Sequence, residues 1–281
     1  MSDDDISLSE KRMYGQTRTE THAYVGSGLG VTRVETAGGQ IGRFSLVRRC
    51  EARDIAGANG EIAVATDDEI LLSTDDGFAA TGFGPATAVG YDADGLLGAG
   101  EGRIARYDDG EWWEMGSVED VRAVGDDLVA AADGVYGLPG CAYLGLHDVA
   151  DVAGPFAATA DGLYRRDPQE GTVGPRENWA LVRSGAHGAV ASEGGRVYAA
   201  AGDTLYELAD NGGADTDADW TPCDLPVRER VVDIASDADT YAITEDGTFL
   251  VDTADESTAD GRGGWRSRSL GVPDVSGIAV A

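Results

Sequence analysis

The stretch Phe-Ala-Ala-Thr-Ala-Asp-Gly-Leu-Tyr at 156–164 decides the fold, because it repeats Leu-Val-Ala-Ala-Ala-Asp-Gly-Val-Tyr at 128–136 almost position by position. In both copies a short, mostly apolar run precedes Asp-Gly and a second apolar run follows it. Asp-Gly readily adopts the positive φ angles of a tight type I′ turn, and such a turn between apolar runs is typical of a β-hairpin. Each copy therefore predicts two short antiparallel strands.

Related hairpins recur along the chain, and seven copies can be aligned. A further apolar segment precedes most of them, as at 231–235, and an aromatic segment follows several, as at Trp112-Trp113. Each unit thus has four short strands; helical periodicity is absent, and 41 glycines suit turns better than helices. Repeated four-stranded units are typical of a β-propeller. The hairpins lie at 23–31, 62–71, 96–104, 128–136, 156–164, 197–206 and 241–249.

The end of the sequence predicts how the ring closes. Residues 275–279 resemble the leading strand at 231–235, and no hairpin follows them. The first hairpin, in contrast, has no leading strand before it. We therefore expect an all-β fold, a β-propeller of seven four-stranded blades in which the C-terminal strand completes the N-terminal blade. The expected organisation is a flexible polar segment over 1–21 and one propeller domain over 22–281.

The charge of the chain is strongly one-sided. The sequence has 34 Asp and 17 Glu against 20 Arg and a single Lys, Lys11, which gives a formal net charge of −30. Such a field repels polyanions and excludes a general nucleic-acid-binding surface. No window approaches 18 consecutive apolar residues, and the first residues lack the basic and apolar regions of a secretory signal. We expect a cytoplasmic protein that contacts neither nucleic acid nor membrane.

The near absence of Lys, the excess of Asp and the small apolar residues resemble the proteome of salt-in halophilic archaea. Molar salt screens repulsion between carboxylates to about 3 Å. An acidic surface for a basic partner is the alternative interpretation. With its hairpins and ring closure, and through Glu10-Lys11-Arg12 and residues 25–31, the chain resembles a β-propeller family of halophilic archaea. This resemblance implies a propeller in a halophilic cytoplasm, and no activity, substrate or catalytic residue.

One hairpin is also similar to the Asp-box of sialidase-like propellers. The match is Ser73-Thr74-Asp75-Asp76-Gly77-Phe78, and residues 108–113 form a looser copy. In that motif a carboxylate caps nearby amides in the turn between two outer strands. The similarity therefore predicts a structural turn.

A candidate interaction face follows from the expected topology. The turns between the two middle strands of each blade lie on the same side of the ring as the segments that cross to the next blade. Arginines gather beside two of these crossings, where they could recognise carboxylate or phosphate through bidentate contacts. The plainer interpretation is that Asp serves turn chemistry and Arg pairs with surplus carboxylates. The candidate face comprises Arg48, Arg49, Arg53, Arg228, Arg230, Arg268, Asp133, Asp161 and Asp246.

Other motifs favour structural roles. Alternating Asp within 210–219 suits the opening of a calcium loop, but Trp220 stands at the sharp-turn Gly position and Pro226 at the closing Glu position. That segment, like 257–264, predicts a solvated loop. The tryptophans recur at expected outer strands and favour packing between blades. The residues concerned are Trp112, Trp113, Trp179, Trp220 and Trp265.

Catalytic and metal chemistry find little support in the sequence. The histidines His22, His147 and His187 lie on different units without paired metal spacing. The cysteines Cys50, Cys141 and Cys223 are far apart and read as free thiols. We expect no catalytic residue, cofactor or metal.

The sequence favours a monomeric, non-enzymatic propeller that presents one face to a protein partner. The alternatives are a hydrolase or lyase for a carbohydrate or small anion at the channel mouth, and a component of a nucleic-acid machine acting through protein contacts.

Overall fold

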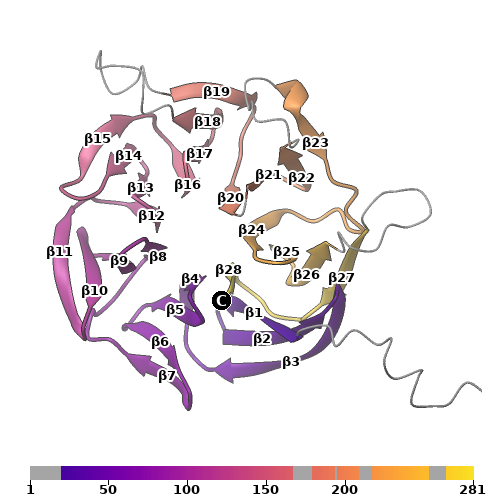
Figure 1. The fold of residues 1–281 in the computed structure, drawn as a ribbon, viewed down its shortest axis with the longest axis horizontal. Coiled ribbons are helices and arrows are strands. Elements are labelled where there is room, and N and C mark those ends of the chain that lie inside the picture. The colour runs from indigo at the N-terminus through magenta and orange to yellow at the C-terminus, as the bar shows by residue number, and fades with distance from the viewer. Residues whose placement is uncertain (1–19, 167–178, 194, 209–216, 253–263) are drawn as a thin grey trace, which may run out of the picture.

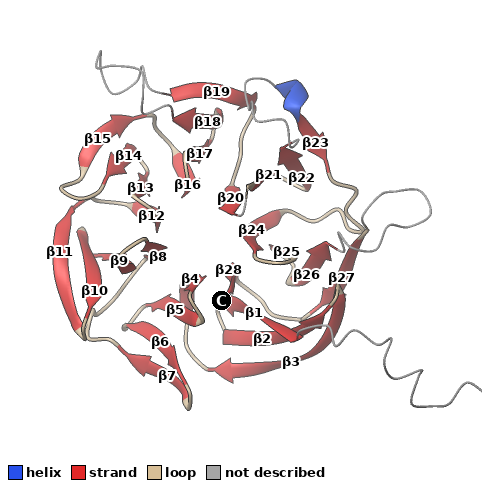
Figure 2. Cartoon of the chain, in the orientation of Figure 1, coloured by secondary structure: helices blue, strands red, loops and turns tan. Residues whose placement is uncertain are grey.

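Seven four-stranded antiparallel sheets stand around a central axis in a closed ring (Figure 1). This computed structural model describes residues 20–166, 179–193, 195–208, 217–252 and 264–281. The predicted all-β, seven-bladed propeller is confirmed. Strands make up almost all of the regular structure, and one short 3₁₀ helix, η1 (Asp217–Asp219), lies on the outside (Figure 2). No helix among the described residues is long and apolar enough to cross a membrane.

We number the blades from the N-terminus, and each runs from its innermost to its outermost strand. Blade 1 holds β28 (Val275–Val280), β1 (Glu20–Ser27), β2 (Gly30–Ala37) and β3 (Gln40–Arg48). Blade 2 holds β4 (Ala52–Ala58), β5 (Glu61–Thr66), β6 (Ile70–Thr74) and β7 (Gly77–Ala80). Blade 3 holds β8 (Ala88–Asp92), β9 (Gly95–Gly100), β10 (Arg103–Asp108) and β11 (Glu111–Ser117).

The remaining blades follow the same order. Blade 4 holds β12 (Val121–Gly125), β13 (Leu128–Ala131), β14 (Gly134–Gly137) and β15 (Ala142–Gly145). Blade 5 holds β16 (Val149–Ala153), β17 (Phe156–Thr159), β18 (Gly162–Arg166) and β19 (Trp179–Ser184). Blade 6 holds β20 (Ala189–Glu193), β21 (Arg196–Ala201), β22 (Thr204–Leu208) and β23 (Trp220–Pro222). Blade 7 holds β24 (Val231–Ser236), β25 (Thr240–Thr244), β26 (Thr248–Asp252) and β27 (Trp265–Ser269).

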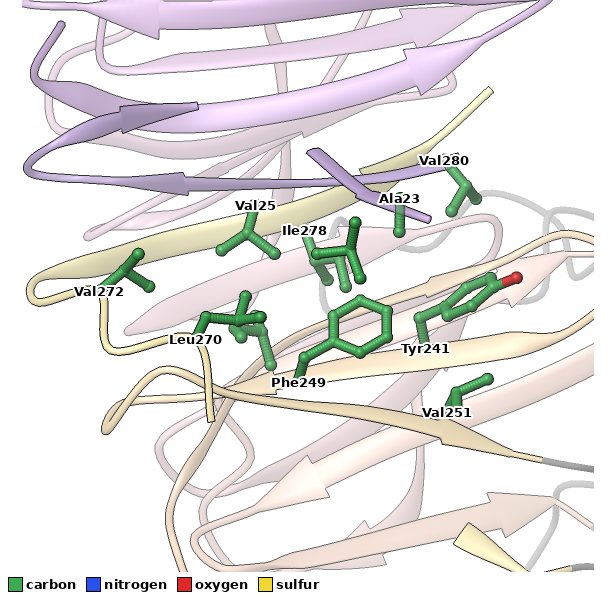
Figure 3. Close-up of a cluster of buried hydrophobic side chains, with 11 residues drawn as sticks. Ala23, Val25, Tyr241, Phe249, Val251, Leu270, Val272, Ile278 and Val280 are labelled. Atoms are coloured by element: carbon green, nitrogen blue, oxygen red, sulfur yellow. The ribbon is translucent and has the colours of Figure 1, made fainter. Parts of the chain in front are cut away.

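The C-terminal strand closes the ring as predicted. β28 pairs antiparallel with β1, with Ala23 opposite Val280 and Val25 opposite Ile278. Side chains from this pair pack against blade 7, where the rings of Tyr241 and Phe249 lie 5.8 Å apart between centroids (Figure 3). Burying this cluster gives the joint between the first and last blades the same apolar packing as the other blade contacts.

Glycines near the ends of inner strands allow neighbouring blades to approach closely. A Cβ atom on Gly57 or Gly90 would collide with a backbone carbonyl oxygen of the adjacent blade, that of Val280 or Val124. In both cases the carbonyl carbon would also lie within 2.9 Å of the added atom. The absence of a side chain at these positions therefore determines how tightly the strands converge on the axis.

Three aspartates join neighbouring inner strands across the blade boundaries. Asp54 on β4 accepts the N–H of Val89 on β8 at 2.9 Å, and its other carboxylate oxygen accepts the N–H of Ile55 at 2.8 Å. The same arrangement recurs twice more, which makes it a repeated feature of the ring. Asp151 accepts the N–H of Val190 at 2.8 Å and of Val152 at 2.8 Å; Asp233 accepts those of Ile278 at 2.8 Å and Ile234 at 2.7 Å.

These aspartate clasps, Asp54, Asp151 and Asp233, satisfy backbone donors at the channel wall. An innermost strand has no strand partner on its channel side, so its N–H groups there need another acceptor. Burial raises the pKa of all three carboxyls, to about 7 for Asp151 and about 6 for Asp233. The negative charge of Asp233 also raises the pKa of Asp151, while the accepted hydrogen bonds oppose the shift.

The close approach at Gly90 gives a first prediction. Gly90→Ala is expected to lower the free energy of unfolding by about 1 to 3 kcal/mol, because the new methyl group would overlap the Val124 carbonyl. Gly125→Ala is the matched control on the next inner strand, where the nearest carbonyl oxygen, that of Val152, would lie 3.9 Å away. The control should be neutral or more stable by up to about 1 kcal/mol. Urea denaturation followed by tryptophan fluorescence measures both, and equal losses would contradict the steric argument.

The aspartate clasps give a second prediction. A carboxyl whose pKa is raised on folding binds its proton more tightly in the native state, so stability falls as pH rises through the shifted value. The unfolding free energy should therefore decline between pH 5 and 8, with Asp151 contributing at most about 1.4 kcal/mol per pH unit below pH 7. Asp151→Asn should flatten this decline, and Asp246→Asn, in an exposed turn, should not. Urea denaturation at pH 5 and pH 8 measures the unfolding free energy of each variant. An equal decline for wild type and Asp151→Asn would refute the contribution assigned to Asp151.

Candidate functional site

The middle turns and the crossing segments share one face of the ring, as the sequence predicted. Backbone hydrogen bonds connect them directly: the N–H of Asp148, in the crossing from blade 4 to blade 5, donates to Ala132 O at 2.8 Å. Ala160, in the middle turn of blade 5, donates to Asp148 O at 3.2 Å. The N–H of Glu245 likewise donates to Arg230 O at 2.9 Å. We call this surface the turn face.

Hydroxyl side chains stabilise several middle turns of this face. The Thr159 hydroxyl donates to Gly162 O at 2.8 Å and accepts the N–H groups of Asp161 and Gly162. Ser27 and Thr66 make the same donation to the residue three positions later, at 3.0 and 2.7 Å. These short bonds replace the backbone partners that turn residues lack, so the turn face is held firmly.

The predicted arginines divide into a group on the turn face and one exception. Arg48, Arg49 and Arg53 are exposed where blade 1 crosses to blade 2. Arg228 and Arg230 are exposed where blade 6 crosses to blade 7. Among the described residues, no carboxylate oxygen lies within 4.0 Å of any of these five side chains.

Other arginines of the chain do have acidic partners. Arg106 pairs with Asp92 and, at 3.2 Å, with Asp94. Arg43 pairs with Glu35 at 3.3 Å. Arg122 and Arg166 approach Asp148 and Asp127 at 3.9 and 3.8 Å. Pairing with surplus carboxylates therefore explains these arginines and does not explain the five on the turn face.

Arg268 belongs to the outer rim of the ring. It lies on β27, where its guanidinium donates to the carbonyl oxygens of Ile41 and Gly42 on β3 and stands 5.0 Å from the centre of the Phe44 ring. These contacts fasten the outermost strands of blades 7 and 1 together. The structure thus separates Arg268 from the arginines of the two crossings, because it extends from an outer strand and not from a crossing segment.

The three predicted aspartates occupy middle turns of the turn face. Asp133 accepts the hydroxyl hydrogen of Tyr136 at 2.8 Å, and Asp161 lies 3.8 Å from His147 Nε2. Asp246 is exposed in the middle turn of blade 7. They are distributed around the ring on different blades, so the structure does not bring the three together as a single site.

One exposed apolar residue of the turn face was not predicted. Leu29, at the tip of the turn between β1 and β2, is 48% exposed. The neighbouring Gly28 N–H donates to Asp274 O at 3.0 Å, which joins this turn to the crossing from blade 7 to blade 1. Leu29 therefore lies on the arc of the ring between the two arginine-bearing crossings. An apolar residue at the centre of the Gly-Leu-Gly turn was the available sequence signal.

Among the described residues, the pocket at one channel mouth does not bring several Arg, Tyr and acidic side chains together. This mouth, opposite the turn face, is a cavity of about 170 Å³ lined mainly by small or apolar residues such as Ala56, Ala191 and Ile234. Glu193 also lines it, and burial together with the charges of Asp237 and Asp126 raises the pKa of this carboxyl. Elsewhere in the channel wall, the carboxylates of the aspartate clasps accept hydrogen bonds from backbone N–H groups.

Several remaining sequence motifs can be located. Trp220 packs edge-on against Phe156 of blade 5, and Trp179 donates its indole N–H to Leu144 O of blade 4 at 2.9 Å, which confirms packing between blades. Trp113 is 59% exposed and does not follow this pattern. The Asp-box-like hairpin does join outer strands β6 and β7, and Ser73 Oγ accepts the N–H of Ile62 at 2.8 Å.

Two predicted loops lie largely outside the described residues. Of the acidic segment at 210–219, the structure describes Asp217–Asp219, where Asp217 accepts the N–H and the hydroxyl hydrogen of Ser184 at 2.8 and 2.9 Å. Of 257–264 it describes residue 264 alone, and of the N-terminal segment 1–21 it describes residues 20 and 21 in β1. Within the described residues, no three His, Cys, Asp or Glu side chains are grouped as metal ligands, and the three cysteines are free thiols.

Solved structures with the same fold are distant in sequence. The chain is similar to the β-propeller domain of Cps50 (Swd1) from Myceliophteria thermophila, with a TM-score of 0.58 and 14% identity over 83% of this chain and 90% of that chain. It is also similar to the WD40 β-propeller domain of Doa1, with a TM-score of 0.54 and 16% identity over 82% and 87% of the two chains.

A third similar structure is a chain of a nidogen/laminin complex, with a TM-score of 0.58 and 8% identity over 93% of this chain and 98% of that chain. At such identities the likeness concerns the fold alone.

No curated protein matches the sequence. The family model described as "Beta-prop_HVO_0234:-like, beta propeller" does match, over residues 7–281. Because that match spans nearly the whole chain and its fold agrees with the seven-bladed ring, the chain belongs to this HVO_0234-like β-propeller family.

Proposed function

We propose that this protein is a non-enzymatic, monomeric interaction scaffold that presents the arc of the turn face over blades 7 and 1 to a protein partner. The observation that carries the proposal is the set of five exposed arginines without an ion-pair partner among the described residues. In a chain with 51 acidic and 21 basic residues, carboxylates far outnumber the arginines with which they could pair. Arginines held clear of carboxylates are available to a partner.

The arc also indicates the chemistry of the partner. Arginine is enriched in the energetically dominant part of protein interfaces, where its planar guanidinium binds carboxylate bidentately. Leu29 supplies an exposed apolar side chain between the two arginine groups. A fitting partner would therefore offer acidic side chains around a small apolar depression.

The similar propellers make this use of the fold plausible without identifying the process. One of the matched chains comes from a complex, that of nidogen with laminin, and another is a WD40 domain. Those partners belong to those proteins. For this chain we take from them only that a propeller can bind a partner through one of its surfaces. The arginines that lack an ion-pair partner among the described residues support the same use independently.

We further propose that the protein works in the cytoplasm of a halophilic archaeon. The support is the net charge of −30 with a single lysine. Carboxylates at this density repel one another in dilute buffer, and concentrated salt screens that repulsion. A high-salt medium also weakens long-range attraction, so binding at the arc would depend on direct arginine contacts and on Leu29.

The interaction proposal is tested with two matched double variants. Arg49→Ala/Arg228→Ala removes one arginine from each crossing, while Arg43→Ala/Arg196→Ala removes two positive charges away from the arc. Tagged wild type, kept at molar salt, should recover a stoichiometric partner from a lysate of the native host. The first double variant should lose that partner at least tenfold, because truncating an interface arginine often costs more than about 1 kcal/mol and two are removed.

The control double variant should recover the partner like wild type, and circular dichroism should show both variants folded. Leu29→Ser, which removes no charge, should weaken the same complex. Equal recovery by wild type and Arg49→Ala/Arg228→Ala would show that the arc is not the interface. Recovery of no partner by wild type would move support to the small-molecule alternative at the channel.

The salt proposal is tested separately. Far-ultraviolet circular dichroism should show β structure in molar potassium chloride and its loss on dialysis into dilute buffer, because unscreened carboxylate repulsion destabilises the compact state. Sucrose at matched osmolarity is the control, since it is excluded from protein surfaces but screens no charge. A full β signal in dilute buffer would contradict adaptation to salt.

A further inference from the structure

A pocket at the junction of blades 4 and 5 has features that the proposed function does not use. Its volume is about 330 Å³, which lies within the range of small-molecule sites. The blades concerned meet where β15 lies beside β18 and β19 (Figure 1). The described residues that line it are Leu146, His147, Thr159, Asp161, Tyr164 and Trp179.

The lining combines aromatic side chains with a single carboxylate. Trp179 and Tyr164 supply ring surface, and Asp161 supplies the negative charge, with 65% of its side chain exposed. His147 Nε2 lies 3.8 Å from Asp161, which places the imidazole beside the carboxylate. Among the described residues that line the pocket, there is no arginine or lysine to neutralise Asp161.

Neighbouring contacts hold these groups in place. The indole N–H of Trp179 donates to Leu144 O at 2.9 Å, and the Thr159 hydroxyl accepts the N–H of Asp161 at 3.2 Å. Leu146 has a φ of +62°, in the left-handed region that is unfavourable for a residue with a Cβ atom. The Tyr143 hydroxyl donates to Leu146 O at 3.0 Å and helps to hold that strained backbone. The wall of the pocket is thus preorganised at an energetic cost.

Among the described residues, the linings of two other cavities lack this combination. The larger cavity between blades 3 and 4, of about 500 Å³, is lined by Glu101, Glu119, Asp120 and Arg122 without an aromatic ring. The channel mouth is lined mainly by small apolar residues. Only at the junction of blades 4 and 5, among these three, do rings and a carboxylate line one pocket.

We propose that this pocket binds an organic ammonium group, such as a quaternary or methylated amine. Aromatic rings attract cations through their negative faces, and the effect is strongest for cations that give up water easily. A metal ion would need more oxygen ligands than one carboxylate provides. The negative field of the whole chain draws cations toward the surface, so the pocket selects among them by shape and by its rings.

Two sources could present such a group: a free small molecule or a methylated lysine of another protein. The chemistry of recognition is shared. The pocket lies on a different arc of the ring from the crossings of Arg49 and Arg228, and its proposal does not depend on a partner at those arginines. Failure of the interaction proposal therefore leaves the pocket proposal in place, and the reverse also holds.

The test compares choline with 3,3-dimethyl-1-butanol, a neutral molecule of nearly the same shape. Isothermal titration calorimetry on the full chain at molar salt should show saturable binding of choline and at least tenfold weaker binding of the neutral analogue. Tyr164→Leu should weaken choline binding by roughly twofold to thirtyfold, the range of a cation–aromatic contact. Asp161→Asn should also weaken it, because it removes the negative charge beside the ammonium group. Asp133→Asn, at the equivalent turn of blade 4, is the matched control and should bind like wild type.

A capped trimethyllysine and a Gly-Ser peptide that carries trimethyllysine distinguish the two sources. Tighter binding of the peptide than of choline supports a protein side chain as ligand, and equal or weaker binding supports a free amine. The proposal is overturned if choline and trimethyllysine both fail to bind folded wild type. It is also overturned if the neutral analogue binds as well as choline, or if Asp161→Asn and Tyr164→Leu, shown to be folded by circular dichroism, leave binding unchanged.

Discussion

A closed ring of sheets leaves one edge of every innermost strand facing the channel. The backbone N–H groups on this edge need hydrogen-bond partners, and the way they find them affects the whole molecule. Three aspartates reach across blade boundaries to accept N–H groups that have no strand partner there. Glycines such as Gly90 let the same strands converge until only a hydrogen atom fits between backbones. The channel wall therefore serves the structure: Asp54, Asp151 and Asp233 accept hydrogen bonds from amides, and the mouth opposite the turn face is lined mainly by small or apolar residues, with Glu193 beside them.

The turn face combines firm support with unpaired charge. Hydroxyl-stabilised turns and crossing segments are hydrogen-bonded to each other, as where the Thr159 hydroxyl accepts the N–H of Asp161 and the N–H of Ala160 donates to Asp148 O. Such a support can hold an arginine away from carboxylates, which flexible loops in an acidic protein would not do. The same rigidity preserves the strained backbone at Leu146. The two proposals assign opposite preferences to two regions of this face, anions to the arginines and cations to the pocket at blades 4 and 5.

The sequence predicted the fold in detail because its turns are local. Asp-Gly dipeptides, flanking apolar runs and the unpaired strand at 275–279 were enough for the blade number and the closure. The candidate site was less predictable. The tertiary fold decides that Arg106 pairs with Asp92 while Arg49 has no carboxylate partner among the described residues, and Arg268 differs from Arg230 because it extends from an outer strand. The aspartate clasps did leave a signal, an Asp within otherwise apolar leading strands at 54, 151 and 233, but its partners are supplied only by the next blade.

The pairing of β28 with β1 has a consequence for the order of folding. Val280 and Ala23 are partners across a separation of more than 250 residues, so the first blade lacks its innermost strand until β28 has been synthesised. Blades 2 to 7 contain only consecutive strands, so their strands can pair before the ring closes. Ring closure carries a large loop-closure entropy, and contacts of this sequence separation slow folding. Until it occurs, the edge of β1 is open to pairing with another chain, which makes the nascent propeller a natural client for chaperones.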